Sequence, residues 1–259
     1  VTDSVFTESD GSYTAGITEG IYTVVYSHDG FLPYTIPGEL NFFDDIELET
    51  LTLAFGNIQE LSGTLSGNQY WTNEYQYWVT GDLTLSQGDT LTIDPGVNVL
   101  FMGFYEFYIG GVLHSVGTEE DSIRFTSGQP VKNKGDWYRL YFVNSSSSIM
   151  AYTSIEYGQR NVYCDYNAPI IIQNCSISNA QYDGYSGDKI IISESHIYNN
   201  NNNGIELWVY TNQTMTISNN YIHDNGNYGV FIEIAGGSAT VPFNEIIGNN
   251  IYNNDDDGI

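Results

Sequence analysis

Isoleucines recur at fixed intervals through the last third of the chain, between about Ile170 and Ile259. Four anchor positions and the four positions five residues before them are all isoleucine: Ile177, Ile197, Ile222 and Ile251, preceded by Ile172, Ile192, Ile217 and Ile246. Two residues after the anchors stand Asn179, Asn199, Asp224 and Asn253, and a glycine follows seven residues after each anchor. Each copy keeps thirteen residues in register, whereas the connection to the next copy lengthens from 7 to 12 to 16 residues.

Constant spacing indicates a packed backbone, and variable spacing indicates a loop. The copies are rich in Ile, Thr, Tyr and Asn and alternate with a period of two, as in residues 214–217, which disfavours a helix. We therefore expect a β-solenoid whose coils stack about 4.8 Å apart. The recurrent Asn or Asp lies at a corner, where amide side chains can hydrogen-bond along the stack and tolerate left-handed backbone.

The repeat resembles that of the right-handed parallel β-helix in the pectin-lyase-like superfamily, in which an apolar residue, Asn, Ile and Asn precede Gly-Ile. The phrase from Leu91 to Val97 also resembles the segment that opens many bacterial surface β-helices. The resemblance implies a fold and no single function, because this architecture hosts lyases, hydrolases, epimerases, adhesins and phage tailspikes.

Residues 1–56 have a different pattern, with short alternating runs separated by turns at Ser9-Asp10-Gly11 and His28-Asp29-Gly30. Together with the phrase from Gly20 to Val24, they resemble the later strands of the carboxypeptidase regulatory-like domain, a small Ig-like or transthyretin-like β-sandwich. We expect an all-β chain: this partial sandwich at 1–56, a linker and entry cap at 57–82, and a parallel β-helix at 83–259.

Composition limits the partners. The 259 residues include 32 acidic and 6 basic ones, for a net charge of −26. This charge excludes nucleic acid as a partner and leaves divalent cations and neutral glycans. It also suits a solvated surface in a salty or extracellular setting. The sequence has no apolar run of about 18 residues, so we expect no membrane span in this segment.

Two features bear on assembly and redox state. Cys164 and Cys175 are the two cysteines, and we expect buried free thiols although successive coils could also pair them. The sequence stops at Ile259, a core position, which favours either a longer parent chain or another subunit that covers the last coil.

Candidate catalytic groups are few. Lyase chemistry needs a base beside calcium-binding acids, but no Lys or Arg follows Lys189. The aspartate and His-Gly pattern of polygalacturonases does not occur. Arg160, near Glu156 and Asp165 in the sequence, is more simply a surface ion pair, and His196 and His223 should point outward as polar surface. We therefore assign no catalytic residue.

Two candidate binding sites remain. Asp255, Asp256 and Asp257, beside Asn253 and Asn254, could gather oxygen ligands for Ca²⁺, although a solvated corner explains them equally simply. Trp208, with Glu206 two residues before it, is the best candidate for a glycan contact, the alternative being core or interface packing. No other cofactor is indicated.

The sequence thus favours a non-catalytic structural or adhesive β-helix, extracellular or at the cell surface, which could assemble end to end into a fibre. Its partners would be other copies of itself, other surface proteins or glycans. The first alternative is a polysaccharide lyase, hydrolase or epimerase acting on acidic or neutral glycans. The second is a carbohydrate-binding module.

Overall fold

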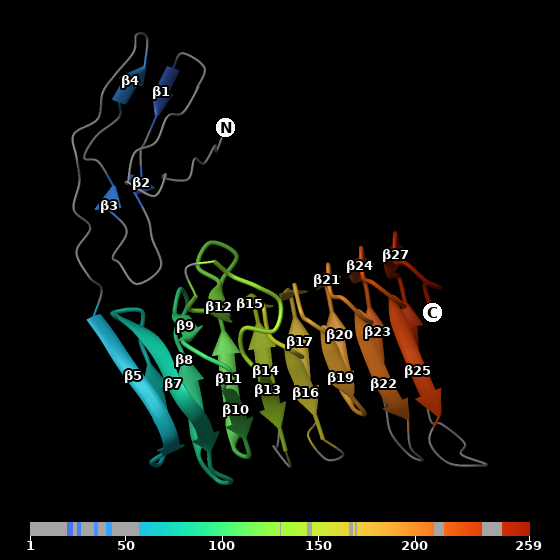
Figure 1. Cartoon of the computed structure of the whole chain (residues 1–259), viewed down its shortest axis with the longest axis horizontal. Helices are drawn as coiled ribbons and strands as arrows, with labels where there is room; N and C mark the ends of the chain where they lie inside the picture. Colours follow the sequence, from blue (N-terminus) through green and yellow to red (C-terminus); the bar gives the residue numbers. More distant parts are fainter. Residues whose placement is uncertain are drawn as a thin grey trace. The chain divides into compact units, whose positions relative to one another are not determined.

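The computed structural model describes residues 57–129, 131–143, 147–165, 168, 170–209, 215–234 and 245–259, together with four short strands before residue 57. The chain divides into two compact units, Val1–Gly56 and Asn57–Ile259. The second unit is a right-handed parallel β-helix, so the all-β solenoid expected from the isoleucine repeat is confirmed. Figure 1 shows its strands side by side along the solenoid.

Each coil contributes one strand to each of three faces. Face 1 contains β5 (Asn57–Leu65), β7 (Tyr75–Leu85), β10 (Glu106–Ile109), β13 (Arg139–Phe142), β16 (Val162–Cys164), β19 (Tyr185–Gly187), β22 (Ile205–Val209) and β25 (Val230–Ile234). Face 2 contains β6 (Gln69–Trp71), β8 (Thr90–Ile93), β11 (Val112–Val116), β14 (Ser148–Ala151), β17 (Ile170–Gln173), β20 (Ile190–Ser193), β23 (Thr216–Ser218) and β26 (Glu245–Ile247). Face 3 contains β9 (Asn98–Phe101), β12 (Ile123–Ser127), β15 (Thr153–Glu156), β18 (Ser176–Ser178), β21 (His196–Tyr198), β24 (Tyr221–His223) and β27 (Asn250–Tyr252). The long strands β5 and β7 bend and so belong to faces 1 and 3 together.

The isoleucines stack in register on two of these faces. Ile172, Ile192, Ile217 and Ile246 pair in sequence along face 2, and Ile177, Ile197, Ile222 and Ile251 do so along face 3. All but the last in each row are fully buried. The constant thirteen residues are therefore the part of the coil that must fit the coil before it, whereas insertions fall between faces 1 and 2.

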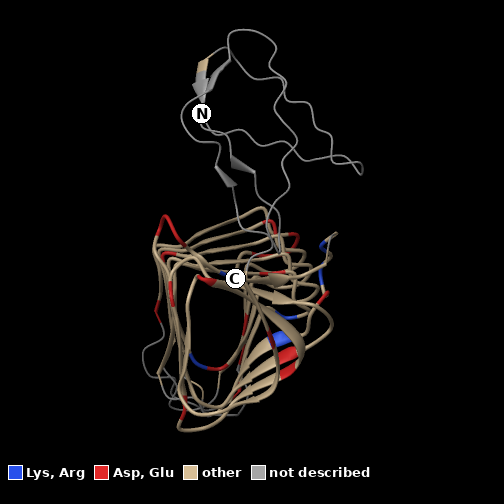
Figure 2. Ribbon diagram, turned by 90° about the vertical axis from the view of Figure 1, so that its left-hand side faces the viewer, with Lys and Arg blue, Asp and Glu red and all other residues tan. Residues whose placement is uncertain are grey.

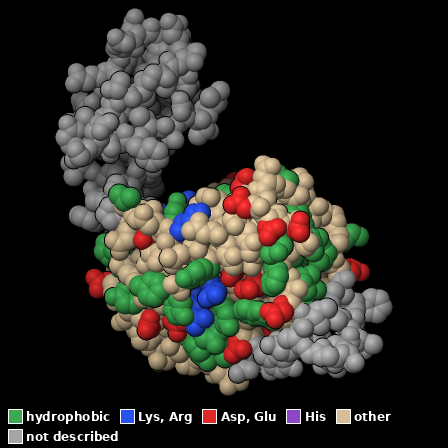
Figure 3. All heavy atoms as spheres, turned by 45° about the vertical axis from the view of Figure 1, so that its right-hand side comes forward, with side chains coloured by type: hydrophobic (Ala, Val, Ile, Leu, Met, Phe, Trp, Pro, Cys, Tyr) green, Lys and Arg blue, Asp and Glu red, His purple; other side chains and the backbone are tan. Residues whose placement is uncertain are grey.

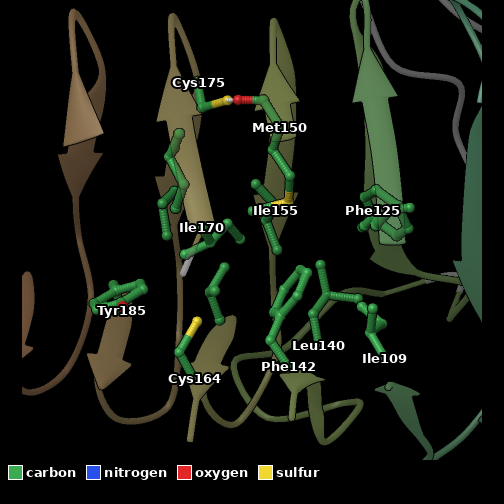
Figure 4. Close-up of a cluster of buried hydrophobic side chains, with 14 of the residues drawn as sticks. Ile109, Phe125, Leu140, Phe142, Met150, Ile155, Cys164, Ile170, Cys175 and Tyr185 are labelled. Atoms are coloured by element: carbon green, nitrogen blue, oxygen red, sulfur yellow. Dashed lines mark hydrogen bonds between the residues drawn. The ribbon is translucent and has the colours of Figure 1, made fainter. Parts of the chain in front are cut away.

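The interior is filled by apolar side chains from all three faces. Figure 4 shows Phe142, Leu140 and Ile109 of face 1 converging with Met150 and Ile155. Cys164 and Cys175 are buried free thiols in this core, as the sequence indicated. Burial raises the pKa of Cys175 to about 12 and that of Cys164 further, so neither is a reactive thiolate at neutral pH.

The β-helix begins with β5 at Asn57, whereas the sequence led us to expect a linker and entry cap at 57–82. Residues 57–82 form β5, β6 and most of β7, and these strands pair with the coils that follow. Trp71 and Tyr77 stack with centroids 4.6 Å apart and are buried. Large aromatic side chains fill the interior here in place of the isoleucine rows, which is why the repeat pattern does not extend to this segment.

In the first unit, two antiparallel pairs are described. β1 (Gly20–Tyr22) pairs with β4 (Leu40–Phe42), and β2 (Val25–Tyr26) pairs with β3 (Tyr34–Thr35). The remainder of the expected β-sandwich lies outside the described residues. No described helix is long and apolar enough to cross a membrane.

Candidate functional site

The outer surface of face 1 carries a column of aromatic side chains. Tyr108, Tyr141 and Tyr163 occupy the same register on successive strands, alternating with buried residues such as Leu140 and Phe142. Their ring centroids lie 5.5 Å and 5.2 Å apart, with interplanar angles of 89° and 65°. Trp208 of β22 extends the set, at 6.0 Å and 60° from Tyr163. We call these four residues the aromatic column.

Arg139 lies among the tyrosines of this column. Its guanidinium carbon is 4.1 Å from the ring centroid of Tyr141, 4.7 Å from that of Tyr163 and 4.4 Å from that of Tyr138. Its Nε donates to Glu106 Oε2 at 3.1 Å. Because rings and carboxylate surround it, the side chain of Arg139 is only 15% exposed, and it stiffens the column by cation–π contact.

A charged cluster borders the column at β19 and β22. Asp183, almost fully buried, accepts from Arg160 Nε at 3.4 Å and from the hydroxyl of Ser186 at 3.1 Å. Its other oxygen accepts from Asn202 Nδ2 at 2.7 Å and from the backbone N–H of Asn203 at 3.1 Å. Asp183 thereby links its own coil to the preceding coil and to the following one.

Glu206 lies next to this cluster on β22. Burial, followed by the neighbouring charge of Asp183 and a hydrogen bond with it, raises the pKa of Glu206 to about 7, against weaker opposing effects of Arg160 and Ser186. Two carboxyl groups in contact cannot both ionise at low cost, which is one reason why the pKa of Glu206 is raised. A carboxyl group protonated near neutrality can donate a hydrogen bond or a proton.

The structure places Glu206 and Trp208 together on the outside of face 1. Both alternate along β22 with buried residues, Ile205, Leu207 and Val209. Trp208 contacts Tyr163, and its register neighbour on β25 is the exposed Glu233. Trp71 and Trp137, in contrast, are buried in the core.

Asp255, Asp256 and Asp257 are all exposed, and the backbone N–H of Asp257 donates to Asp256 Oδ1 at 3.0 Å. Among the described residues, no group of three or more His, Cys, Asp or Glu side chains has an arrangement that could hold a metal ion. The Ca²⁺ site stays a prediction from the sequence.

The corner residues Asn179, Asn199, Asp224 and Asn253 all have positive φ, between 53° and 57°. Asn199 Nδ2 donates to Asn179 Oδ1 at 2.6 Å, and Lys134 Nζ bonds the backbone oxygen of Asn199 at 2.6 Å. A longer amide ladder lies one residue further along the chain, inside the coil. There Asn200 donates to Asn225, and Asn225 donates to Asn254, each at 2.9 Å.

The sequence also named an arginine and two histidines, and the structure gives each of them partners. Arg160 pairs with Asp183 rather than with Glu156, whose basic partner is Arg124 at 3.9 Å. His196 and His223 project from face 3, where His196 stacks on Tyr221 and His223 stacks between Tyr198 and Tyr252. They form ring stacks along the solenoid, away from the aromatic column.

Sequence reasoning did not find Asp183, Ser186, Tyr141 or Tyr163. Tyr141 could have been found from the alternation of side chains along β13. Leu140 and Phe142 point inward, so the residue between them must point outward. Asp183 had no comparable signal, since its partners come from the preceding and following coils.

Figure 3 shows basic side chains among hydrophobic and acidic ones on one side of the helix.

Comparison with known protein families gives a match over the C-terminal half of the chain. Residues 134–259 match the family model described as the right handed beta helix region. No curated protein and no solved structure matches the chain. The segment from residue 134 onward is therefore a right-handed β-helix by its sequence pattern as well as by its fold.

Proposed function

We propose that this chain is an adhesive β-helix, displayed outside the cell or on its surface, that binds glycan along face 1. The aromatic column is the observation that carries the proposal. Sugar rings stack their C–H faces on Tyr and Trp, and neighbouring ring centroids of the column lie 5.2–6.0 Å apart, close to the length of one sugar residue. Trp208 and Glu206, chosen from the sequence, lie at this column.

The neighbouring charges support binding rather than lyase chemistry. Arg139 and Arg160 are the arginines of face 1, and each is paired with a carboxylate, Glu106 and Asp183 respectively. An arginine whose guanidinium is already engaged by a carboxylate and by aromatic rings is not free to approach a substrate proton as a base. A net charge of −26 accords with a secreted or surface protein, which is the location that we propose.

The test is to measure glycan binding with and without the column. Binding partners are first sought on a glycan array, and the affinity for each hit is then measured by calorimetry. Trp208→Ala and Tyr163→Ala should each weaken binding about tenfold, the loss of one stacking contact of about 1–1.5 kcal/mol. Tyr221→Ala is the matched control, because Tyr221 is 46% exposed on face 3. Equal losses in all three variants, or no binding by the parent protein, would contradict the proposal.

A polysaccharide hydrolase is the second candidate, and the Glu206–Asp183 pair is the observation that favours it. A carboxyl group with a pKa of about 7 is suited to act as a general acid at neutral pH. If the chain is a hydrolase, Glu206→Gln should abolish release of reducing sugar from a bound glycan and leave binding within about twofold. Binding without turnover by the parent protein would exclude this candidate.

A further inference from the structure

The charge around the aromatic column limits which glycan it can take. On or within two residues of strands β10, β13, β16, β19, β22 and β25, the described part of face 1 has six acidic and three basic residues. The acidic ones are Glu106, Asp165, Asp183, Asp188, Glu206 and Glu233, and the basic ones are Arg139, Arg160 and Lys189. The pKa of Glu206 is raised to about 7, so Glu206 carries only part of a charge at neutral pH, but the excess remains when it is left out. A polyuronate lying along the column would meet like charge.

The two arginines cannot reverse this field. Glu106 neutralises Arg139 at 3.1 Å and Asp183 neutralises Arg160 at 3.4 Å, so neither presents its full charge to a ligand carboxylate. Their side chains are also only 15% and 31% exposed. Recognition of an anionic sugar by Arg requires an open, bidentate approach, which these contacts occupy.

Arg139 already occupies the tyrosine end of the column, since three tyrosine rings lie within 4.7 Å of its guanidinium carbon. A ligand cation is therefore expected at the end that Arg139 does not cover. At the other end of the column, Trp208 and the exposed Glu233 are register neighbours on β22 and β25. A ring for stacking beside an exposed carboxylate fits a sugar that carries an ammonium group.

We propose, as an inference that rests on the proposed glycan binding, that the ligand of face 1 is a cationic glycan, an oligomer of amino sugars with free ammonium groups. The sugar rings stack on the aromatic column. The ammonium groups lie near Trp208 and Glu233. Polyuronates are excluded by the acidic excess.

The experiment compares three β-1,4-linked hexasaccharides that differ in charge: glucosamine, glucose and glucuronate. Calorimetry at about 0.05 M NaCl should give an affinity for the glucosamine oligomer about three- to tenfold above that for the glucose oligomer, and no detectable glucuronate binding. At about 0.5 M NaCl this preference should shrink to about twofold or less.

Glu233→Gln and Glu245→Gln form a matched pair of variants. Each removes one exposed carboxylate, but Glu233 is on face 1 beside Trp208, whereas Glu245 begins β26 on face 2. Glu233→Gln should weaken glucosamine binding about threefold or more without changing glucose binding, and Glu245→Gln should change neither.

The outcomes separate this inference from the proposed function. Equal binding of glucose and glucosamine oligomers, or preferred binding of glucuronate, would overturn the cationic ligand class and leave glycan binding intact. Binding of none of the three, with no hit on the glycan array, would overturn both. A glucosamine preference that Glu245→Gln removes as fully as Glu233→Gln does would show general attraction to an acidic protein, and would also overturn the inference.

Discussion

At the scale of single residues, the ionisation of Glu206 is coupled to the fold. Its pKa is raised to about 7, so the folded protein holds a proton that the unfolded chain releases near its ordinary value of 4.5. The stabilisation is therefore fully present below about pH 4.5 and is lost as the pH rises through 7. After allowance for solvent screening, its size is on the order of 1–2 kcal/mol.

Glu206→Gln should remove this pH dependence. The neutral amide keeps a donor toward Asp183 at every pH, so the variant should be more stable than the parent by about 1–2 kcal/mol at pH 8 and equal to it near pH 5. Urea unfolding at the two pH values measures the difference. A gap between the two proteins that is the same at pH 5 and pH 8 would show that Glu206 is not protonated in the folded state.

At the scale of the coil, the internal asparagine ladder determines how one turn fits the next. Asn225 is buried, and its Oδ1 accepts from the backbone N–H of Asn200 at 3.2 Å and from the Asn200 amide at 2.9 Å. Its Nδ2 donates to Asn254 at 2.9 Å and to the carbonyl of Ile197 at 3.3 Å. One side chain thus satisfies polar groups of both the preceding and the following coil.

Asn225→Ala should therefore destabilise the helix by about 2–4 kcal/mol, because it leaves buried donors and acceptors without partners. Asn250→Ala is the control, since Asn250 is exposed at the start of β27. Urea unfolding followed by tryptophan fluorescence compares the two. A loss below about 1 kcal/mol in Asn225→Ala would mean that water replaces the amide in the ladder.

The same coil shows what a sequence can predict here and what it cannot. Ile172, Ile177 and their equivalents could be predicted because parallel stacking forces identical positions into register. The strands of residues 57–82 could not, because Trp71 and Tyr77 fill the core there with a different shape. The outward direction of Glu206 and Trp208 follows from their alternation with Ile205. The neighbours of Glu206 come from another coil, and which residues they are depends on the lengths of the loops between coils. No short-range sequence pattern encodes this contact.

At the scale of the whole molecule, the excess of acidic groups sets the electrostatic environment of every site. Figure 2 shows Asp and Glu positions spread around the coils rather than collected in one place. Such a distribution keeps polyanions away from all faces and attracts cations to each. Repulsion between these like charges also destabilises the folded state, because stacking brings them closer together than they are in the unfolded chain.

Screening that repulsion should stabilise the protein. Raising NaCl from about 0.05 M to 0.5 M shortens the Debye length severalfold, so the free energy of unfolding should increase by about 1–2 kcal/mol.

Glu119 and Glu120 are adjacent, exposed and of the same sign in the turn between β11 and β12. Replacing both with Gln should add about 0.5 kcal/mol at low salt and almost nothing at high salt. Tryptophan fluorescence reports on the β-helix alone, since Trp71, Trp78, Trp137 and Trp208 all lie in it. A parent protein that loses stability in salt would mean that attractive ion pairs, such as Arg139–Glu106 and Arg160–Asp183, outweigh the repulsion.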